Sequence, residues 1–538
     1  MIISQTLPSQ ICHSTDQSPE YNVFWPFLYD IVQSTDDATL LTALKWKKLD
    51  SIKISDKSNS SLGWIYTLNF NNTASERLKL DYISKKSIDN AINQAYYYRF
   101  GYYDDPNISI PNYLEECTDH WGFYNGNTQK CLTQLRTWDF TQNGPANLTQ
   151  YYSLREPTND INVAAEGSLK SITYPTKGKT TFEYEQNTYS KLFDITACDG
   201  TAPNCLQSAS GNPKCGGLRI KKITTEPVFG PAMIKEYFYV KNYTLGANVS
   251  SLESSGILGG KNQYIWYNYN SKVNSSTVKK IEKFIISGQS VLPMSVNSQG
   301  VQLGYSEVVE KKEDGSYSIY KYSNYSNEDQ THFDEKPLPG SYNDISPYFV
   351  YSSKSLERGK LLSTEVYTKN GIKSKQDNYL YKGLSTDFVR SLNLIANTYV
   401  CYNNELWTSY VGLPYKRYVY KYFMTKETIN ENYNPTGQEP LIKTTHFLYN
   451  SLNLLSNKTS TNGRGKTFES RYKYPFEFSE SIYSTMATLN MLNYPIEETT
   501  SVNNNITTSK LTTYKVNGSG YVPDKVYSLE TATPLAST

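Results

Sequence analysis

The chain has 538 residues, with 53 basic and 51 acidic side chains, a net charge of +2, and 49 tyrosines against 19 phenylalanines. So small a net charge creates no global basic field that would attract nucleic acid or an anionic membrane. No apolar run approaches the roughly 18 residues of a membrane-spanning helix, so no transmembrane segment is expected. Because tyrosine favours half-buried pleated surfaces, the composition predicts an all-β chain of successive antiparallel β-hairpins with a few short helices.

The first 60 residues are predicted to form an irregular N-terminal segment. They hold an apolar patch over Val23–Val32 and a short helical candidate over Leu40–Lys48. Residues 1–8 lack the charged start and the long apolar stretch of a secretory signal peptide. A surface protein needs such a signal, so we expect this chain to be part of a longer protein; an intracellular location is the alternative.

Residues 61–160 are predicted to be rich in strands and loops. Trp64–Phe70 and Arg77–Ile83 alternate as two paired strands. Ser87–Tyr97 is predicted to be a short helix with a serine cap. The segment Asp119–Gly126 contains two glycines and three aromatic residues, which indicates a tight turn packed on rings.

From residue 161 to residue 538 the sequence predicts a succession of β-hairpins. In the first one, over residues 167–187, Tyr174-Pro175 ends a strand because proline has no N–H for the ladder. Gly178 is expected to supply the permissive backbone of the turn. A further strand begins with Cys215-Gly216-Gly217-Leu218-Arg219.

Later hairpins carry clearer turn signals. Asp314-Gly315 predicts a type I′ turn, and Asn370-Gly371 predicts another two-strand turn. Residues 242–300 are predicted to include an exposed loop, and Thr386–Ile395 a short helix. The other predicted strands are Lys235–Val240, Tyr305–Lys311, Tyr317–Ser323, Leu361–Lys369, Ile372–Tyr381, Thr444–Tyr449, Leu454–Thr459, Thr467–Tyr474, Ile496–Thr500, Thr508–Val516 and Lys525–Leu529.

Three of the seven cysteines, Cys198, Cys205 and Cys215, lie in a loop rich in Gly, Pro, Asn and Ser. They could form a disulfide in an oxidising compartment or remain free thiols. A metal site is disfavoured because the spacings include no Cys-x-x-Cys and no histidine lies nearby.

Several segments resemble the large Rhs/YD-repeat surface proteins of Bacteroidetes-type bacteria. They include residues 167–187, 215–223 and Asp119–Gly126, and they occur in the expected order. Tyr449–Leu455 is similar to the Tyr-Asp-x-x-Gly-Arg-Leu repeat unit, with Asn453 in place of glycine. Asparagine tolerates a left-handed backbone best after glycine, so Asn453 is predicted to adopt one.

The resemblance implies a shell of β-hairpins that spirals around a C-terminal payload, here without the payload. The expected function is therefore a non-enzymatic scaffold section of a secreted or cell-surface protein that would enclose or deliver a toxin. The expected partners are other segments of the shell or its payload, and cell-surface glycans. No catalytic residue, cofactor or metal is expected. The structural motif residues would be Tyr174, Pro175, Gly178, Gly216, Gly217, Arg219, Gly371, Tyr449 and Asn453.

Two other functions fit parts of the sequence. An adhesive or carbohydrate-binding protein would display tryptophan and tyrosine rings on one face. A glycosidase would need two carboxylates facing each other across a cleft. The acidic doublets Glu115-Glu116, Asp334-Glu335 and Glu497-Glu498 do not form such pairs by themselves, because neighbours on a strand point to opposite faces, and they are expected to be solvated.

Overall fold

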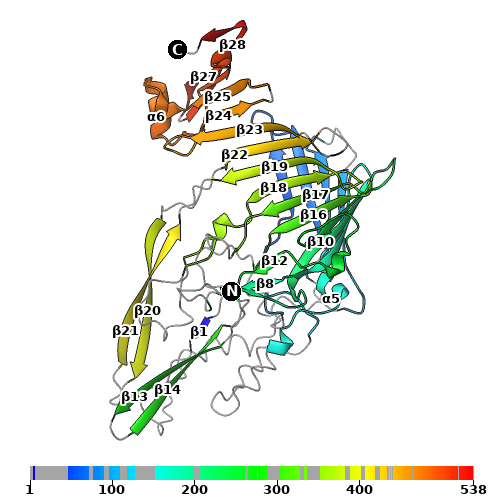
Figure 1. Cartoon of the computed structure of the whole chain (residues 1–538), viewed down its shortest axis with the longest axis vertical. Coiled ribbons are helices and arrows are strands. Elements are labelled where there is room, and N and C mark those ends of the chain that lie inside the picture. Colours follow the sequence, from blue (N-terminus) through cyan, green and yellow to red (C-terminus); the bar gives the residue numbers. More distant parts are fainter. Residues whose placement is uncertain are drawn as a thin grey trace.

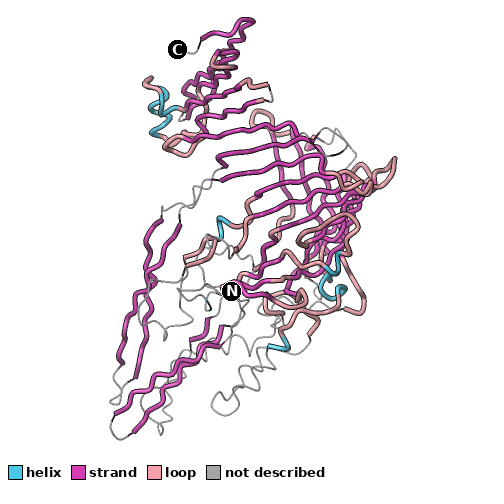
Figure 2. The backbone as a smooth tube through the Cα atoms, viewed as in Figure 1, coloured by secondary structure: helices cyan, strands magenta, loops and turns pink. Residues whose placement is uncertain are grey.

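The described part of the chain is almost entirely antiparallel β-structure, which confirms the predicted all-β class (Figures 1 and 2). The computed structural model describes residues 4–6, 47–71, 77–89, 96–108, 118–127, 152–194, 197, 205–260, 265–274, 277–287, 302–326, 332–335, 352–381, 388–400, 406–418, 424–432, 436, 438, 440–462, 464–518 and 520–536. The apolar patch at residues 23–32 and most of the helix expected at 40–48 lie outside these ranges.

Nineteen strands form one continuous sheet, in which each strand pairs antiparallel with the strand before it. They are β2 (Ser51–Ser55), β3 (Gly63–Asn71), β4 (Lys79–Ser87), β5 (Tyr96–Tyr102), β6 (Leu169–Thr173), β7 (Lys179–Thr188), β10 (Lys214–Glu226), β11 (Met233–Phe238), β16 (Glu307–Lys312), β17 (Tyr317–Tyr322), β18 (Leu361–Tyr367), β19 (Lys373–Tyr381), β22 (Met424–Asn432), β23 (Pro440–Tyr449), β24 (Leu455–Thr461), β25 (Thr467–Lys473), β26 (Glu497–Val502), β27 (Asn505–Asn517) and β28 (Gly520–Ala536).

The order of strands in this sheet follows the order of the chain. Figure 1 shows the strands stepping upward from β10 through β19 to β28, with the blue N-terminal strands drawn behind them, so the sheet curves. The sheet continues across the two boundaries between the predicted regions, at residues 60/61 and 160/161, because β2 pairs with β3 and β5 pairs with β6. The predicted succession of hairpins is therefore one wall of sheet.

Five hairpins share one turn of five residues. The N–H of the first residue donates to the carbonyl of the fifth, the N–H of the fourth donates to the carbonyl of the first, and the fourth residue has a positive φ. This is a type I turn followed by a left-handed bulge residue, a common three-residue hairpin loop. The fourth residues are Lys177 (φ 68°), Gly315 (φ 85°), Gly371 (φ 77°), Asn453 (φ 61°) and Gly465 (φ 74°).

The predicted left-handed backbone of Asn453 is therefore confirmed, and Asp314-Gly315 is not a type I′ turn. Type I′ needs positive φ at both central residues, whereas only Gly315 has it here, because a three-residue loop needs one left-handed position. The type I′ geometry occurs instead at Asn503 and Asn504 (φ 49° and 65°), between the paired residues Val502 and Asn505.

The turn after β6 also differs from the prediction. Its left-handed residue is Lys177, and Gly178 has no positive φ. A Cβ on Gly178 would lie 3.3 Å from the carbonyl oxygen of Glu226, so the glycine permits the close approach of β10. Pro175 occupies the second turn position, where its fixed φ suits a type I turn.

Tyrosine hydroxyls tie the ends of strands to their neighbours, which gives the high tyrosine content a structural role. In each case the hydroxyl donates to a main-chain carbonyl of the preceding strand in the sheet, and burial raises the pKa of the phenol, so the donor stays neutral. The pairs are Tyr102 to Leu80 (2.8 Å), Tyr184 to Leu169 (2.6 Å), Tyr239 to Ile220 (2.8 Å), Tyr449 to Met424 (2.9 Å) and Tyr474 to Leu455 (2.9 Å).

Smaller β elements lie beside this wall. A four-stranded sheet has the order β15 (Leu303–Tyr305), β12 (Gly256–Leu258), β8 (Lys191–Phe193), β9 (Leu206–Ser208). Two long hairpins extend toward the lower left of Figure 1. They are β13 (Ile265–Asn274) with β14 (Thr277–Ser287), joined by β1 (Ser4–Thr6), and β20 (Phe388–Val400) with β21 (Leu406–Tyr418).

The apolar cores are small and local. Helix α6 (Ser481–Thr488) buries Tyr483 and Met486 beside Ile496 and against Leu511 of β27. A second core lies on the β16–β17 face, under the segment that follows β11. The other described helical elements with bounds are α5 (Ile161–Ala165), η3 (Val249–Ser251), η4 (Ser355–Glu357) and η5 (Pro475–Glu477). In the described part of the chain, no helix has the length and apolar character needed to cross a membrane.

Two local predictions are wrong. Ser87 ends strand β4 and residues 96–97 begin β5, so the described ends of the predicted helix are strands. The helix predicted at Thr386–Ile395 overlaps strand β20. In both cases pairing with distant residues outweighs the local preference of the sequence. The exposed loop predicted within residues 242–300 is present at residues 244–251, while Gly256–Leu258 form the buried strand β12.

Candidate functional site

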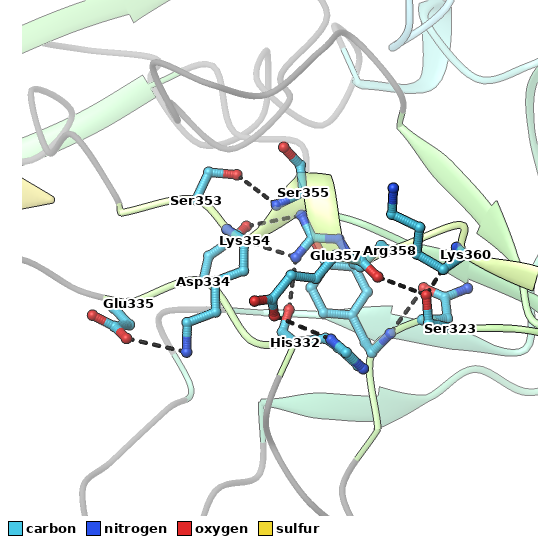
Figure 3. Close-up of polar contacts among 12 residues, drawn as sticks. Ser323, His332, Asp334, Glu335, Ser353, Lys354, Ser355, Glu357, Arg358 and Lys360 are labelled. Carbon is cyan, nitrogen blue, oxygen red and sulfur yellow. Dashed lines mark hydrogen bonds and ion pairs between the residues drawn. The ribbon is translucent and has the colours of Figure 1, made fainter. Parts of the chain in front are cut away.

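A cluster of charged side chains lies where residues 323–326, 332–335 and 352–360 meet (Figure 3). Lys416, at the root of hairpin β20–β21, joins it through Glu335. The cluster combines three carboxylates with three permanent cations and one histidine. These residues are Asp334, Glu335, Glu357, Lys354, Arg358, Lys416 and His332.

The local backbone of this cluster is set by a turn between η4 and β18. Gly359 has φ 81°, and its N–H donates to the carbonyl of Ser323 at 2.8 Å. The hydroxyl of Ser323 donates to the carbonyl of Glu357 at 2.6 Å and accepts from the N–H of Lys360 at 2.9 Å. The segment after β17 is thereby fixed against the turn that carries Arg358.

Arg358 is the centre of the cluster. Its guanidinium donates to both carboxylate oxygens of Asp334, at 3.0 and 3.4 Å, and to the carbonyl of His332 at 2.7 Å. The Asp334 side chain is 3% exposed and also accepts from the N–H of Lys354 at 2.8 Å. A two-pronged arginine–carboxylate pair combines charge with fixed geometry, so this contact orients both segments.

An aromatic stack connects Arg358 to the four-stranded sheet. The guanidinium lies 4.1 Å from the ring centre of Tyr325, and that ring stacks on Phe193 of β8 at 4.3 Å. Phe333 packs against Phe193 at 5.1 Å, and all three rings are buried. The charge cluster is therefore seated on an apolar core.

Glu357 is the most deeply buried carboxylate of the cluster, with no exposed surface. One oxygen faces Nδ1 of His332 at 3.3 Å, and the other, Oε1, has no hydrogen-bond partner. A buried acceptor without a hydrogen-bond partner destabilises the folded state, and the contact with His332 offsets part of this cost for Glu357.

Glu335 fastens the root of hairpin β20–β21. It pairs with Lys354 at 3.1 Å and with Lys416 of β21 at 3.0 Å, and it accepts a short hydrogen bond from the hydroxyl of Tyr418. Although burial opposes the charged form, these three donors lower the pKa of Glu335. The N–H of Lys416 also donates to Ser352 Oγ at 2.9 Å. The hairpin therefore leaves the cluster in a defined direction.

The contacts of this cluster hold three segments of the chain together, and we call it the clamp. Asp334 and Glu357 are buried and each has a polar partner, so neither is presented to a substrate in the described structure. Among the described residues, no group of three or more His, Cys, Asp or Glu side chains could hold a metal ion. The expectation that Asp334-Glu335 is a solvated doublet is wrong, because residues distant in sequence bury Asp334 and pair both carboxylates, while Glu335 remains 33% exposed.

The Gly216-Gly217 pair makes a separate junction on β10. The register between β7 and β10 shifts between Cys215 and Leu218, and Gly217 has φ 88°. A Cβ on Gly216 would lie 2.3 Å from Asp119 Oδ2, and one on Gly217 would lie 2.9 Å from Phe123. The two glycines therefore form a bulge that the Asp119–Gly126 loop covers.

Arg219 lies two residues beyond this bulge and joins three strands. Its guanidinium donates to Glu185 at 2.7 Å, to Thr188 at 3.1 Å and to the hydroxyl of Tyr305 at 2.9 Å. The ring of Tyr239 lies 4.5 Å from the guanidinium carbon. The structure thus brings Gly216, Gly217 and Arg219 together in one junction. The other motif residues lie elsewhere: Tyr174 in hairpin β6–β7, Gly371 in β18–β19, and Tyr449 with Asn453 in β23–β24.

The loop over the bulge is built on Asp119. Its carboxylate accepts from the N–H groups of Trp121 and Phe123, both at 2.9 Å, yet burial raises its pKa to about 6. The neighbouring His120 is 3% exposed and makes edge contacts with Trp121 at 5.6 Å and a tilted contact with Tyr152 at 5.6 Å. This packing agrees with the turn packed on rings that was predicted for Asp119–Gly126.

The loop cysteines differ from one another. Cys205 is disulfide-bonded and lies in the apolar core with Phe193. Cys215 is a free, fully buried thiol, and burial raises its pKa to about 12, so of the two alternatives left open for the loop cysteines Cys215 takes the free thiol. Cys198 lies outside the described residues.

Sequence reasoning missed His332, Glu357 and Lys416, because their partners come from segments that no short-range pattern connects. One signal was present: Arg358-Gly359 combines a permanent cation with a residue that permits a left-handed turn. Comparison of the chain with protein-family models and with curated proteins gives no match.

Proposed function

We propose that this chain is a non-enzymatic structural section of an Rhs/YD-repeat-like shell, whose curved sheet encloses or presents another polypeptide. The observation that carries the proposal is the continuous sheet of nineteen strands paired in chain order. A wall of this kind grows by adding one hairpin after another, so its length and curvature depend on the turns and strand ends rather than on a single core.

The recurring devices of the sheet support this interpretation. Five hairpins repeat the same five-residue turn, and five tyrosines repeat the same hydroxyl-to-carbonyl bond between adjacent strands. They provide the physical repeat that is only faint in the sequence. The bonded state of Cys205 favours an oxidising compartment, in agreement with a secreted or cell-surface location.

The test is site-directed photo-crosslinking on the two faces of β23 in the source cells. Leu448 is 60% exposed and Lys443 is exposed, and their odd spacing puts them on opposite faces of the strand. A photo-reactive amino acid is placed at position 443 in one variant and at position 448 in another. One of the two positions, the one on the face that encloses the partner polypeptide, should crosslink to it, and the other should not. Absence of crosslinks from both faces, or equal crosslinking from both, would contradict enclosure.

Fractionation of the same cells tests the location. An antibody should detect the protein in the surface or secreted fraction, with Cys205 resistant to alkylation until a reductant is added. A cytosolic protein with a reactive Cys205 thiol would contradict the proposed location.

An adhesive, glycan-binding function is the second candidate, and one observation favours it. The register of β3, β4 and β5 places Trp64, Tyr66, Lys85 and Tyr98 on one face, where the Lys85 ammonium lies 4.1 Å from the Trp64 ring centre. Tyr98 is 39% exposed. A partly exposed aromatic face with a cation suits stacking on sugars. Binding on a glycan array that Trp64→Ala abolishes would support this function.

A further inference from the structure

Strands β2 to β6, whose first members are blue in Figure 1, carry exposed cations on the face opposite the Trp64 ring. The register assigns Lys53, Lys86 and Arg99 to this face, on β2, β4 and β5. All three side chains are exposed, and none of them forms an ion pair with a residue that the structure describes. We call this surface the Arg99 face.

The local charge of these strands is strongly positive, although the whole chain has a net charge of only +2. Strands β2 to β6 contain six basic residues and one acidic residue, Asp81, which lies at a register irregularity of β4. The face ends at β7, where the register places Lys179 on it, opposite the exposed Glu226 of β10. The next carboxylate of β7 on this face, Glu183, pairs with Lys222 at 3.1 Å.

Rings and hydroxyl groups fill the space between these cations. The guanidinium carbon of Arg99 lies 5.3 Å from the ring centre of Tyr82 and 5.6 Å from that of Tyr97, so two rings support this side chain. The Tyr97 residue is 41% exposed. The register also assigns hydroxyl-bearing residues to the Arg99 face, namely Thr67, Ser84, Ser171 and Thr173.

We propose that the Arg99 face binds an acidic polysaccharide, an extended chain in which charged and uncharged sugars alternate. Its acid groups pair with Lys53, Lys86 and Arg99, and its hydroxyls exchange hydrogen bonds with the serine and threonine hydroxyls between them. Positive charge without a carboxylate partner is complementary to such a ligand. The inference does not depend on whether the sheet encloses another polypeptide.

The spacing of the cations favours this ligand over a nucleic acid. Lys53 and Lys86 lie in one register row, two strands apart, which separates their backbones by about 10 Å. Lys86 and Arg99 lie on adjacent strands with an offset of four residues, or about 14 Å. A nucleic acid carries a phosphate on every nucleotide, so phosphates would fall between these cations without a partner.

The other chemistry of the face points the same way. Bases bind single-strand-binding proteins by stacking on open aromatic rings, whereas Arg99 already lies over Tyr82 and Tyr97. A membrane interface needs exposed apolar side chains beside the cations. The exposed aliphatic residues of β2, Ile52 and Ile54, belong to the opposite face, which they share with Trp64.

Binding of the full chain to hyaluronate tests the proposal, because this polysaccharide carries a carboxylate on every second sugar. We expect saturable binding at about 0.05 M salt that weakens at about 0.5 M, where surface charges are screened. Dextran, an uncharged polysaccharide, should not bind. Lys86→Gln with Arg99→Gln should weaken binding to hyaluronate at least about 10-fold, because two charged hydrogen-bond donors are lost. Lys86→Arg keeps the charge and should lose much less.

A matched pair of cations on another part of the sheet is the control. Arg464→Gln with Lys466→Gln removes two exposed cations from the β24–β25 turn and should bind hyaluronate as the unchanged protein does. All variants should keep the thermal unfolding of the unchanged protein, because the replaced side chains are exposed. Absence of saturable binding, or an equal loss in the control pair, would overturn the proposal. Tighter binding to single-stranded oligothymidylate than to hyaluronate, or binding to anionic vesicles alone, would overturn it too.

Discussion

Removal of the Arg358 side chain is the sharpest test of the clamp at the hairpin root. In Arg358→Ala, the buried Asp334 carboxylate, 3% exposed in the unchanged protein, loses its cation and keeps only neutral donors, among them the N–H of Lys354 and the hydroxyl of Tyr325. Removing one partner of a buried ion pair typically costs about 3–5 kcal/mol, because the other charge is left uncompensated. The lost contact with the ring of Tyr325 adds about 0.5–2 kcal/mol.

The expected loss in unfolding free energy is therefore at least about 3 kcal/mol. Arg358→Lys keeps the charge but loses the two-pronged contact, so its loss should be smaller, about 1–2 kcal/mol. Asp334→Asn combined with Arg358→Ala should cost less than the sum of the two single changes, because no unpaired charge remains.

Urea unfolding followed by circular dichroism measures these differences, and hydrogen exchange at β17 and β18 locates them. Arg464→Ala is the control, since this arginine is exposed in a hairpin turn and should change stability by less than about 0.5 kcal/mol. If Arg358→Ala costs no more than Arg464→Ala, the cluster does not stabilise the protein and the clamp is refuted.

The remaining predictions concern turns and titration. Asn453→Val should lower the melting temperature, because a β-branched residue disfavours the observed φ of 61° and should cost about 1–2 kcal/mol of unfolding free energy. Asn453→Gly should leave the melting temperature unchanged. Equal melting temperatures for the two variants would contradict the left-handed conformation assigned to residue 453. Hydrogen bonds from Tyr367, Lys321 and Lys373 outweigh the effect of burial and lower the pKa of Glu365 to about 2. The stabilisation by this carboxylate should therefore be complete above about pH 4.5 and disappear as the pH falls toward 2. Glu365→Gln should flatten this part of the curve of stability against pH, and an unchanged curve would contradict the role of Glu365. Asp119 behaves in the opposite way, because burial raises its pKa to about 6 and the folded state therefore binds the proton more tightly. The free energy of unfolding should increase as the pH falls from above 6 toward 4. Asp119→Asn, whose amide oxygen can still accept from the N–H groups of Trp121 and Phe123, should remove this dependence in unfolding curves measured at a series of pH values.

The sequence predicted the strands of the main sheet well where they alternate and where their turns are short. β6–β7, β16–β17, β18–β19 and β23–β24 lie close to their predicted positions, and Asn453 takes the predicted left-handed backbone. These features depend on residues close together in the chain, so local pattern and turn chemistry are sufficient.

Local pattern failed where a distant strand supplies the partner. Residues 388–395 carry a helical pattern, yet they pair with β21 over the full length of a hairpin. The doublet Asp334-Glu335 resembles a solvated pair, but the cations that neutralise it come from residues 354, 358 and 416. No short window of the sequence contains these partners.

The sequence by itself therefore determined the class of the fold and the places of its short turns, because each turn is formed by a few consecutive residues, although the backbone conformations at Asp314-Gly315 and Gly178 differ from the prediction. Only the tertiary structure decided that the hairpins join into one curved sheet, that Gly216-Gly217 accommodates Asp119 and Phe123, that Arg358 pairs with Asp334, and that Glu335 holds the root of hairpin β20–β21. These contacts join segments far apart in the chain. Their energies depend on burial and on the geometry of charges, which arise only when the chain has folded.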